Sequence, residues 1–393
     1  MLSYDLYENC NINRILLLLA GLWPFNQSKL TQVQIIMCLS IIASFTIFQL
    51  TALLTSECTP DFVITVFSNA LASFCTFLIY SSFVVNNRAM KYLLEQLQQI
   101  CNNITDKNEI AIIKSYGINA KRFTTGLILS GAVFLVVIQL IWLHVFDIFL
   151  PENESTGHRL QFMVTEYFFD QEKYFYLIIL HMNATIFVSS LGVIATGTMF
   201  LTYLLHVCGM FKIAYRIIVS IQVNVQYNIN VEDVIMIYKK IVYAINIHRK
   251  AMMICTLMMK EFEGIYCIII VILVCGMSLN LYRIFQIISF ENDRAKIFIH
   301  FGYVISILIY LFLGNYTAQQ ITDHNNDVYA AIYNTRWYVA PLHIQKLVLL
   351  LLQRGNKPFY LTIGKVFVAS LEGFATLTSS SMSYFTVMYS VQQ

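Results

Sequence analysis

The chain has 393 residues, of which 58% are apolar and only 12% are charged, with a formal net charge of +3. A soluble domain carries about 25% charged residues, so this composition excludes an ordinary soluble enzyme and predicts a chain surrounded by membrane lipid. The basic residues are spread over several connecting segments instead of forming one patch, and we expect no nucleic-acid partner.

Seven stretches are long and apolar enough to cross a bilayer, which takes about 20 residues in a helix. Residues 1–32 precede them and contain the run LLLLAGLWPF, which ends at Pro24 and favours an amphipathic or interfacial helix. The predicted spans are Val33–Leu54, Phe62–Val85, Thr125–Phe149, Phe175–Val207, Gly264–Ile288, Ile297–Asn315 and Val366–Tyr389.

The distribution of Lys and Arg between the connecting segments predicts the orientation of these spans. The N-terminal segment and the segments after spans two, four and six hold 20 of the 25 basic residues, whereas the other segments hold 4. We therefore expect an all-α membrane protein with a cytoplasmic N-terminus and an extracellular C-terminus. The sequon at Asn153 then lies in an outer loop, where it is a candidate for glycosylation.

Long polar segments between the spans predict helices outside the bilayer. Residues from about 208 to 263, after span four, have apolar residues at helical spacing, as do parts of residues 316–365. We expect cytoplasmic helical extensions of residues 33–315, followed by a cytoplasmic anchor segment at 316–365 and by the last helix and tail at 366–393. Ile344–Arg354 is too short to span, and is either a helix of the anchor segment or the first half of a broken last helix.

The last span differs from the others because nine of the 21 residues in SLEGFATLTSSSMSYFTVMYS, Ser370–Ser390, are Ser or Thr. At 100° per residue, one side carries Phe374, Leu377, Phe385, Met388 and Tyr389, and the opposite side is polar except near its end. Polar groups at membrane depth face protein or water. The polar side comprises Glu372, Thr376, Ser379, Ser380, Ser383, Val387, Ser390 and Val391.

We interpret this polar side as the lining of a pore shared by several subunits, since one wet helix cannot enclose a pore alone. Val387 and Val391 would form a hydrophobic gate near the outer end. Two alternatives remain: the hydroxyls bond back to their own helix carbonyls, or the small residues simply let helices pack closely. Glu372 either favours cations in the pore or pairs with Lys365 or Arg354.

Aromatic and amide side chains in the outer halves of spans two, three, four and six indicate a cleft for a small lipophilic ligand. The alternative for each of them is ordinary helix packing or an aromatic belt at the membrane surface. The candidates are Phe67, Gln139, Trp142, Phe146, Tyr176, Phe187 and Tyr303.

Other classes of membrane protein fit the pattern less well. The inner end of span three, KRFTTG, has no Asp-Arg-Tyr-like triplet, the last span has no Pro, and the predicted N-terminus is inside, which argues against a G-protein-coupled receptor. No internal repeats indicate a transporter. Four histidines are spread over three spans without the spacing of metal ligands, so we expect neither an enzyme nor a cofactor, and each should face a neighbouring helix or an interface. They are His144, His181, His206 and His300.

The C-terminal part carries a more specific pattern. Gly314-Asn315 ends span six, and it is followed by AIYNTRWY (Ala331–Tyr338), KPFYLTIGKVFVASLEGF (Lys357–Phe374) and SYFTVMYSV (Ser383–Val391). Over roughly the last 80 residues these segments resemble insect odorant receptors, and upstream of them the topology and loop lengths match.

The resemblance implies a tetrameric, odorant-gated, non-selective cation channel in the plasma membrane of a sensory neuron dendrite. Such receptors pair an odour-binding subunit with a shared co-receptor, and the chain lacks the long insertion after span four that marks the co-receptor. The family's gate position corresponds to Val387, with Val391 one turn further out, and its odour pocket lies in the outer half. A gustatory-type channel is the nearest alternative, although Ser383-Tyr384 replaces the Thr-Tyr of those receptors and no Gln-Phe follows. A metabotropic receptor or a transporter is an alternative from another class.

Overall fold

The computed structural model describes residues 10–145, 165–171, 173–224, 231–291, 293–357 and 359–392, and these residues are almost entirely helical. The all-α prediction is therefore confirmed. The elements are α2 (Asn11–Leu19), α3 (Lys29–Thr55), α4 (Pro60–Val85), α5 (Asn87–Asn102), α6 (Lys107–Val145), α8 (Phe175–Asn224), α9 (Val231–Gln286), η1 (Ile287–Glu291), α10 (Arg294–Asn334), η2 (Trp337–Val339), α11 (Leu342–Gly355), β1 (Thr362–Ile363), β2 (Phe367–Val368) and α12 (Leu371–Gln392).

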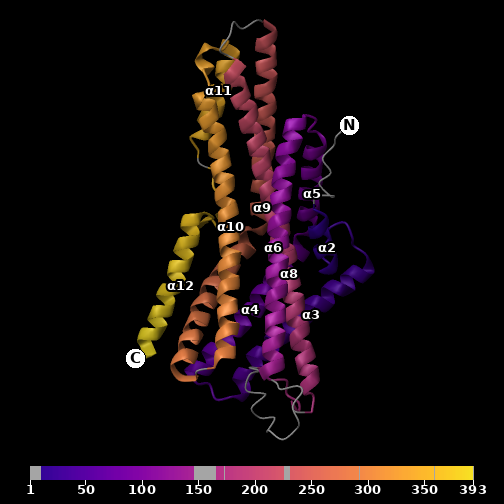
Figure 1. Ribbon diagram of the computed structural model, residues 1–393, viewed down its shortest axis with the longest axis vertical. Coiled ribbons are helices and arrows are strands. Elements are labelled where there is room, and N and C mark those ends of the chain that lie inside the picture. The colour runs from indigo at the N-terminus through magenta and orange to yellow at the C-terminus, as the bar shows by residue number, and fades with distance from the viewer. Residues whose placement is uncertain are drawn as a thin grey trace.

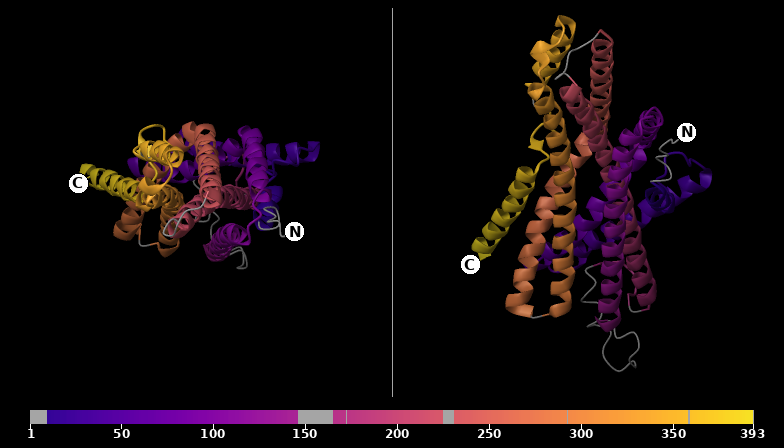
Figure 2. Two further views of the ribbon diagram at one scale, coloured as in Figure 1. Left: turned by 90° about the horizontal axis from the view of Figure 1, so that it is seen from above. Right: turned by 45° about the horizontal axis from the view of Figure 1, so that its top comes forward.

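Six of these helices, α3, α4, α6, α8, α9 and α10, are long and apolar enough to cross a membrane. Their positions match the first six predicted spans. The helix α12 has 22 residues, enough to span, but its Ser and Thr residues lower its hydropathy. It lies at the edge of the bundle in Figure 1 and in both views of Figure 2.

Three of the long helices extend well beyond the predicted spans. The helices α8, α9 and α10 have 50, 56 and 41 residues. At 1.5 Å per residue the longest reaches about 84 Å, whereas the apolar part of a bilayer is about 30 Å thick. The excess length forms what we call the upper bundle, at the top of Figure 1, from the C-terminal half of α8, the N-terminal half of α9, the C-terminal half of α10 and α11.

The upper bundle has a continuous apolar core. Phe211 and Cys255 are fully buried there, and α11 contributes Ile344 and Val348 to the same cluster. Figure 1 shows α11 beside the end of α10 and far from the lower end of α12. Of the two alternatives for Ile344–Arg354, the structure therefore supports a separate helix of the anchor segment.

The N-terminal helix α2 is amphipathic, as its sequence predicts, and packs one face into the protein. Asn13 and Leu17 are buried, whereas Leu19 is exposed. The Asn13 side-chain amide donates to the carbonyl of Thr198, at 3.2 Å, and to the hydroxyl of Thr202, at 2.5 Å, both on α8. Buried polar groups need such partners, so Asn13 fixes α2 to one position on α8.

A short hairpin separates α11 from α12. Its turn residues Gly364 and Lys365 have φ values of +62° and +56°, the pattern of the type I′ turn that joins two adjacent strands. A Cβ atom on Gly364 would lie 2.8 Å from the Cys267 sulfur on α9, so the turn also needs glycine for its close approach. The predicted start of the last span at Val366 is wrong because Phe367–Val368 form the second strand, and the helix begins only at Leu371.

Candidate functional site

The helix α12 presents two different sides to its surroundings. Its apolar side packs on α9 and α10: the Phe374 ring lies 5.6 Å from that of Phe312, and the Tyr389 ring lies 4.7 Å from that of Phe285. Leu377 lies in the middle of this contact and is nearly buried. This arrangement agrees with the division of the helix that the sequence predicts.

The opposite side of α12 faces outward from the subunit. Val387 and Val391 are 58% and 82% exposed. Earlier along the same side, a hollow of about 500 Å³ follows the helix surface. Its lining includes five of the predicted pore residues: Glu372, Thr376, Ser379, Ser380 and Ser383, together with Ala375 and Tyr384.

Three of the hydroxyl groups on this side donate to carbonyls of their own helix. Thr376 donates to the Glu372 carbonyl at 3.0 Å, Ser380 to Thr376 at 2.8 Å, and Ser383 to Ser379 at 3.0 Å. Each hydroxyl proton is thus occupied, while the oxygen retains acceptor capacity. Bonding back to the helix and facing water are therefore compatible, and the resulting surface offers acceptors, which suit water and cations.

Glu372 lies in the first turn of α12 and is exposed. A carboxylate is favoured there by the helix dipole. Among the described residues no ion pair joins it to Lys365 or Arg354, so within one subunit the predicted pairing is absent. The carboxylate is left on the same side as the hydroxyl groups.

The base of α12 is held by a residue whose role the sequence analysis missed. The buried Asn315 on α10 accepts a hydrogen bond from the Ser370 amide at 3.0 Å and donates to the Leu311 carbonyl at 2.8 Å. The Ser370 hydroxyl accepts from the Gly373 amide and caps the helix. A Cβ atom on Gly373 would lie 2.5 Å from the Val368 carbonyl, so only glycine fits this close turn. The Gly314-Asn315 motif marks this position in the sequence, but the motif alone does not indicate that Asn315 binds the start of α12.

A second fixed point lies halfway along α12. The Ser278 hydroxyl of α9 lies 3.0 Å from the carbonyl oxygen of the fully buried Ser381 and 2.8 Å from the carbonyl oxygen of Val274, and its single hydrogen is shared between them. The lower half of the helix then rests on the ring of Phe285. The gate residues therefore lie on a helix that is bonded to its own subunit at its base and middle.

The structure does not gather the predicted ligand residues into one pocket. Phe67, Tyr176 and Phe187 are 41%, 73% and 59% exposed. Gln139 is exposed and donates to the Asn183 side chain at 2.7 Å, and Tyr303 is half-buried. The side chains of Trp142 and Phe146, and the glycosylation candidate Asn153, lie outside the described residues. Their ligand-binding role remains a prediction.

An outer aromatic cluster between α3 and α8 was also missed. The ring nitrogens of His181 lie 3.1 Å from the Ser44 hydroxyl and 2.8 Å from the Tyr167 hydroxyl. Phe45 and Phe48 surround the imidazole edge-on. The prediction that His181 faces a neighbouring helix is confirmed, but Tyr167 comes from the segment before α8, a contact that helical periodicity does not reveal.

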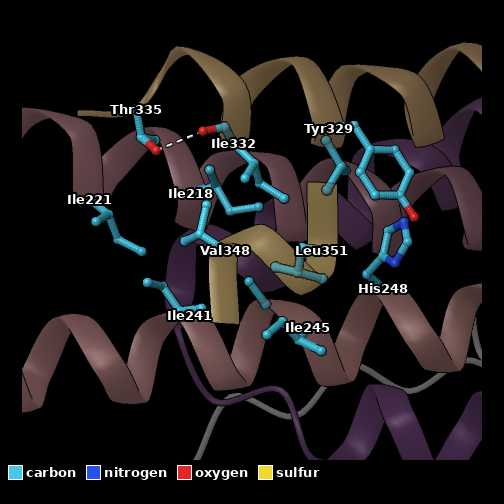
Figure 3. A pocket seen from close by; sticks show the side chains of 12 residues that line it. Ile218, Ile221, Ile241, Ile245, His248, Tyr329, Ile332, Thr335, Val348 and Leu351 are labelled. Carbon is cyan, nitrogen blue, oxygen red and sulfur yellow. Dashed lines mark hydrogen bonds between the residues drawn. The ribbon is translucent and has the colours of Figure 1, made fainter. Parts of the chain in front are cut away.

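The upper bundle contains one further hollow, drawn in Figure 3, of about 30 Å³. Aliphatic side chains such as Ile241 and Val348 line it, and His248 lies at one end. This volume suits a water molecule or two and is too small for an odorant-sized ligand. Burial lowers the pKa of His248, whose imidazole bonds to the Asn325 side chain at 3.0 Å, so this histidine is a neutral core residue.

Comparison with known proteins agrees with this architecture. Residues 59–382 match the family model described as 7tm Odorant receptor. The chain is 27% identical over 111 residues to Odorant receptor 10 of Aedes albopictus, covering 28% of this chain and 30% of that protein. It is 28% identical over 102 residues to Odorant receptor Or2 of Anopheles gambiae, covering 26% and 27%. These matches span less than a third of either curated relative.

The fold is similar to that of a solved structure over nearly its full length. The structure of the insect olfactory receptor OR5 from Machilis hrabei in complex with eugenol superposes with a TM-score of 0.83 at 15% identity, covering 98% of each chain. The same receptor without a named ligand gives a TM-score of 0.79, also at 15% identity and with 98% of each chain covered. The predicted seven-helix membrane fold is thereby confirmed. Since the family match covers most of the sequence, this multi-pass membrane protein belongs to the 7tm Odorant receptor family.

Proposed function

We propose that the chain is an odour-binding subunit of an odorant-gated, non-selective cation channel, assembled as a heterotetramer with the odorant receptor co-receptor. The observation that carries this proposal is the outward side of α12. It combines back-bonded hydroxyls, the exposed carboxylate of Glu372, and the exposed valines Val387 and Val391 at its far end. Around a shared axis, this side would give a wet, cation-favouring vestibule closed by a ring of apolar side chains.

The upper bundle offers a surface for the assembly. Apolar side chains that remain exposed around α11 and the hairpin include Tyr333, Leu342, Leu350 and Val366, which are 62% to 90% exposed. Exposed apolar surface of this kind marks protein–protein contact. Contact here would hold subunits together through their upper bundles while leaving the α12 helices free to move apart.

The ligand we propose is a small, volatile, lipophilic molecule bound in the outer half, among the aromatic candidates. The similar Machilis receptor is described in complex with eugenol, a molecule of that kind. The ligand would open the pore by binding the open state more tightly than the closed state. The site of action would be the plasma membrane of a sensory neuron dendrite.

Co-expression in cells tests the proposal. The chain together with a co-receptor is expected to give odour-evoked cation currents for some members of a panel of volatiles, and neither subunit alone should reproduce that response profile. Currents that disappear when G-protein signalling is blocked would instead support a metabotropic receptor. Responses to non-volatile tastants without the co-receptor would support the gustatory alternative.

The membrane orientation has its own test. Epitope tags at both ends, probed on intact and permeabilised cells, should show the C-terminal tag outside and the N-terminal tag inside. An exposed N-terminal tag on intact cells would contradict the pore proposal, because Val387 and Val391 would then lie on the wrong side.

A further inference from the structure

A cluster of polar side chains lies where α4, α9 and α10 meet near their lower ends; all its members except the exposed Asp61 are buried. We call Asp61, Asn280, Arg283, Gln286 and His300 the outer polar network. Arg283 and Gln286 are only 6% and 4% exposed, and they lie in the last turn of α9, just after its long apolar stretch. Ionisable groups at membrane depth are costly to bury, so their presence requires a specific arrangement of partners.

Gln286 is the centre of this network. Its amide nitrogen donates to the carboxylate of Asp61 on α4 and to the hydroxyl of Tyr282, at 3.1 Å. Its amide oxygen accepts from the guanidinium of Arg283, at 2.8 Å. One neutral side chain thus connects a carboxylate and a guanidinium, and it ties the beginning of α4 to the end of α9.

A second connection joins α10 to the same stretch of α9. A ring nitrogen of His300 lies 2.8 Å from the side-chain oxygen of Asn280, and the Asn280 amide donates to the Gly276 carbonyl at 2.7 Å. Both connections end within residues 280–286 of α9. The relative position of three helices is therefore fixed at about two turns of one of them.

The other side of these turns carries α12. Ser278 and Phe285 are seven residues apart, so they lie on one side of α9. Ser278 bonds to the Ser381 carbonyl, and the Phe285 ring contacts Phe385 and Tyr389, with centroids 6.4 and 4.7 Å away. At about 100° per residue, Asn280 and Arg283 point away from this side of α9, whereas Gln286 lies about 100° from Phe285. The network and the proposed gate helix thus contact different sides of the same short segment.

From this geometry we propose that the outer polar network couples the outer ends of α4 and α10 to α12, with Gln286 as the central positioning residue. A displacement of α4 or α10 by a ligand strains the bonds at Gln286 and Asn280. This strain displaces the α9 segment, and α12 moves with that segment because α12 rests on Ser278 and Phe285. This inference rests on the proposed channel function.

The test first replaces the side-chain amide of Gln286 by a carboxylate. A second substitution at Asp61 then restores a hydrogen bond between the two positions, with the amide and the carboxylate exchanged. Gln286→Glu removes the donor to Asp61 and places two carboxylates together. Adding Asp61→Asn supplies a new amide at position 61 that donates to the new carboxylate at position 286. Glu57→Gln removes one exposed charge from the loop before α4 and is the matched control.

In currents recorded with the co-receptor, Gln286→Glu is expected to change resting current and odorant potency together. The potency shift should be about tenfold, the scale of one charge-assisted hydrogen bond, and nearly equal for chemically different odorants. Asp61→Asn in the same chain should return both quantities to wild type, and Glu57→Gln should leave them unchanged. A change restricted to some odorants, or none at normal surface expression, would overturn the coupling.

Hydrogen exchange on the purified protein tests the coupling without any current. Gln286→Glu is expected to speed exchange in the segment 371–392 severalfold, and the double variant to reverse it. Unchanged exchange in that segment would refute the inference even if the channel is functional. The exchange in this segment could change as expected in both variants while the wild-type chain with its co-receptor carries no odour-evoked current. That result would refute the proposed function and leave the coupling supported.

Discussion

In the upper bundle, large side chains such as Phe211 and Ile254 have at most 1% of their surface exposed, and the hollow described there measures about 30 Å³. By contrast, Leu377 and Ser381 are the buried residues within the described part of α12, which leaves one whole side open. Dense packing resists displacement, whereas a helix held on one side can move at a modest cost. The comparison indicates that the upper bundle holds the subunit together and that α12 is the element free to respond.

The largest expected effect comes from opening the core of the upper bundle. Phe211→Ala removes a fully buried ring and is expected to destabilise this part of the protein by about 3–5 kcal/mol. Thermal unfolding in detergent should show a lower midpoint, and surface expression should fall. Ile235→Ala, at a 50% exposed position on α9, is the control and should leave the midpoint nearly unchanged. Equal stability of both variants would contradict the dense packing of the upper bundle core.

The next effect concerns the proposed gate. Val387→Ala removes two methyl-sized groups from an exposed position, lowering the cost of hydrating the constriction by about 1.5 kcal/mol, or roughly tenfold in resting current. Whole-cell recording without odorant measures this leak. Met382→Ala, which is also exposed on α12 but lies outside the hydroxylated side, should leave it unchanged. Equal resting current in the two variants would show that Val387 does not form the gate.

A smaller effect is expected at the base of α12. Asn315→Ala removes the acceptor for the Ser370 amide and should cost about 1–3 kcal/mol. Asn315→Asp retains an acceptor oxygen and should cost less. Thermal unfolding and maximal odour-evoked current should rank the two variants in that order. The reverse ranking would show that burying a carboxylate beside the Leu311 carbonyl costs more than losing the bond accepted from Ser370.

The smallest effect is expected at Glu372. Glu372→Gln removes an exposed negative charge from the proposed vestibule and should lower single-channel conductance by less than about threefold at low ionic strength. The difference should fade as salt is raised, because exposed charges are screened. A conductance independent of this substitution at low salt would place the carboxylate outside the ion path.

Local patterns were enough to predict several parts of this molecule. Six spans follow from the length and apolar content of the segments, and the two sides of α12 follow from helical periodicity. The boundary of the last span was wrong by five residues because Val366–Ala369 are apolar enough to pass for helix. Positive φ values at Gly364 and Lys365 turn this stretch into a hairpin, and the turn packs closely against Cys267, which is distant in sequence.

The positioning residues escaped prediction for a related reason. Asn315, Gln286 and Asn280 look like isolated polar residues within apolar helices. Their importance depends on partners that lie 55, 225 and 20 positions away in the chain. No spacing rule within one helix indicates such pairs.

The sequence by itself determined a lipid-embedded, all-helical chain whose last helix carries one polar and one apolar side, because composition and periodicity are properties of single segments. The tertiary structure alone decided which neighbour each side meets: the apolar side of α12 rests on α9 and α10, and the hydroxylated side is left open. It also decided that Gln286 and Asn315 hold helices together. Hydrogen bonds and packing between segments depend on distances in space, and these exist only once the helices have assembled.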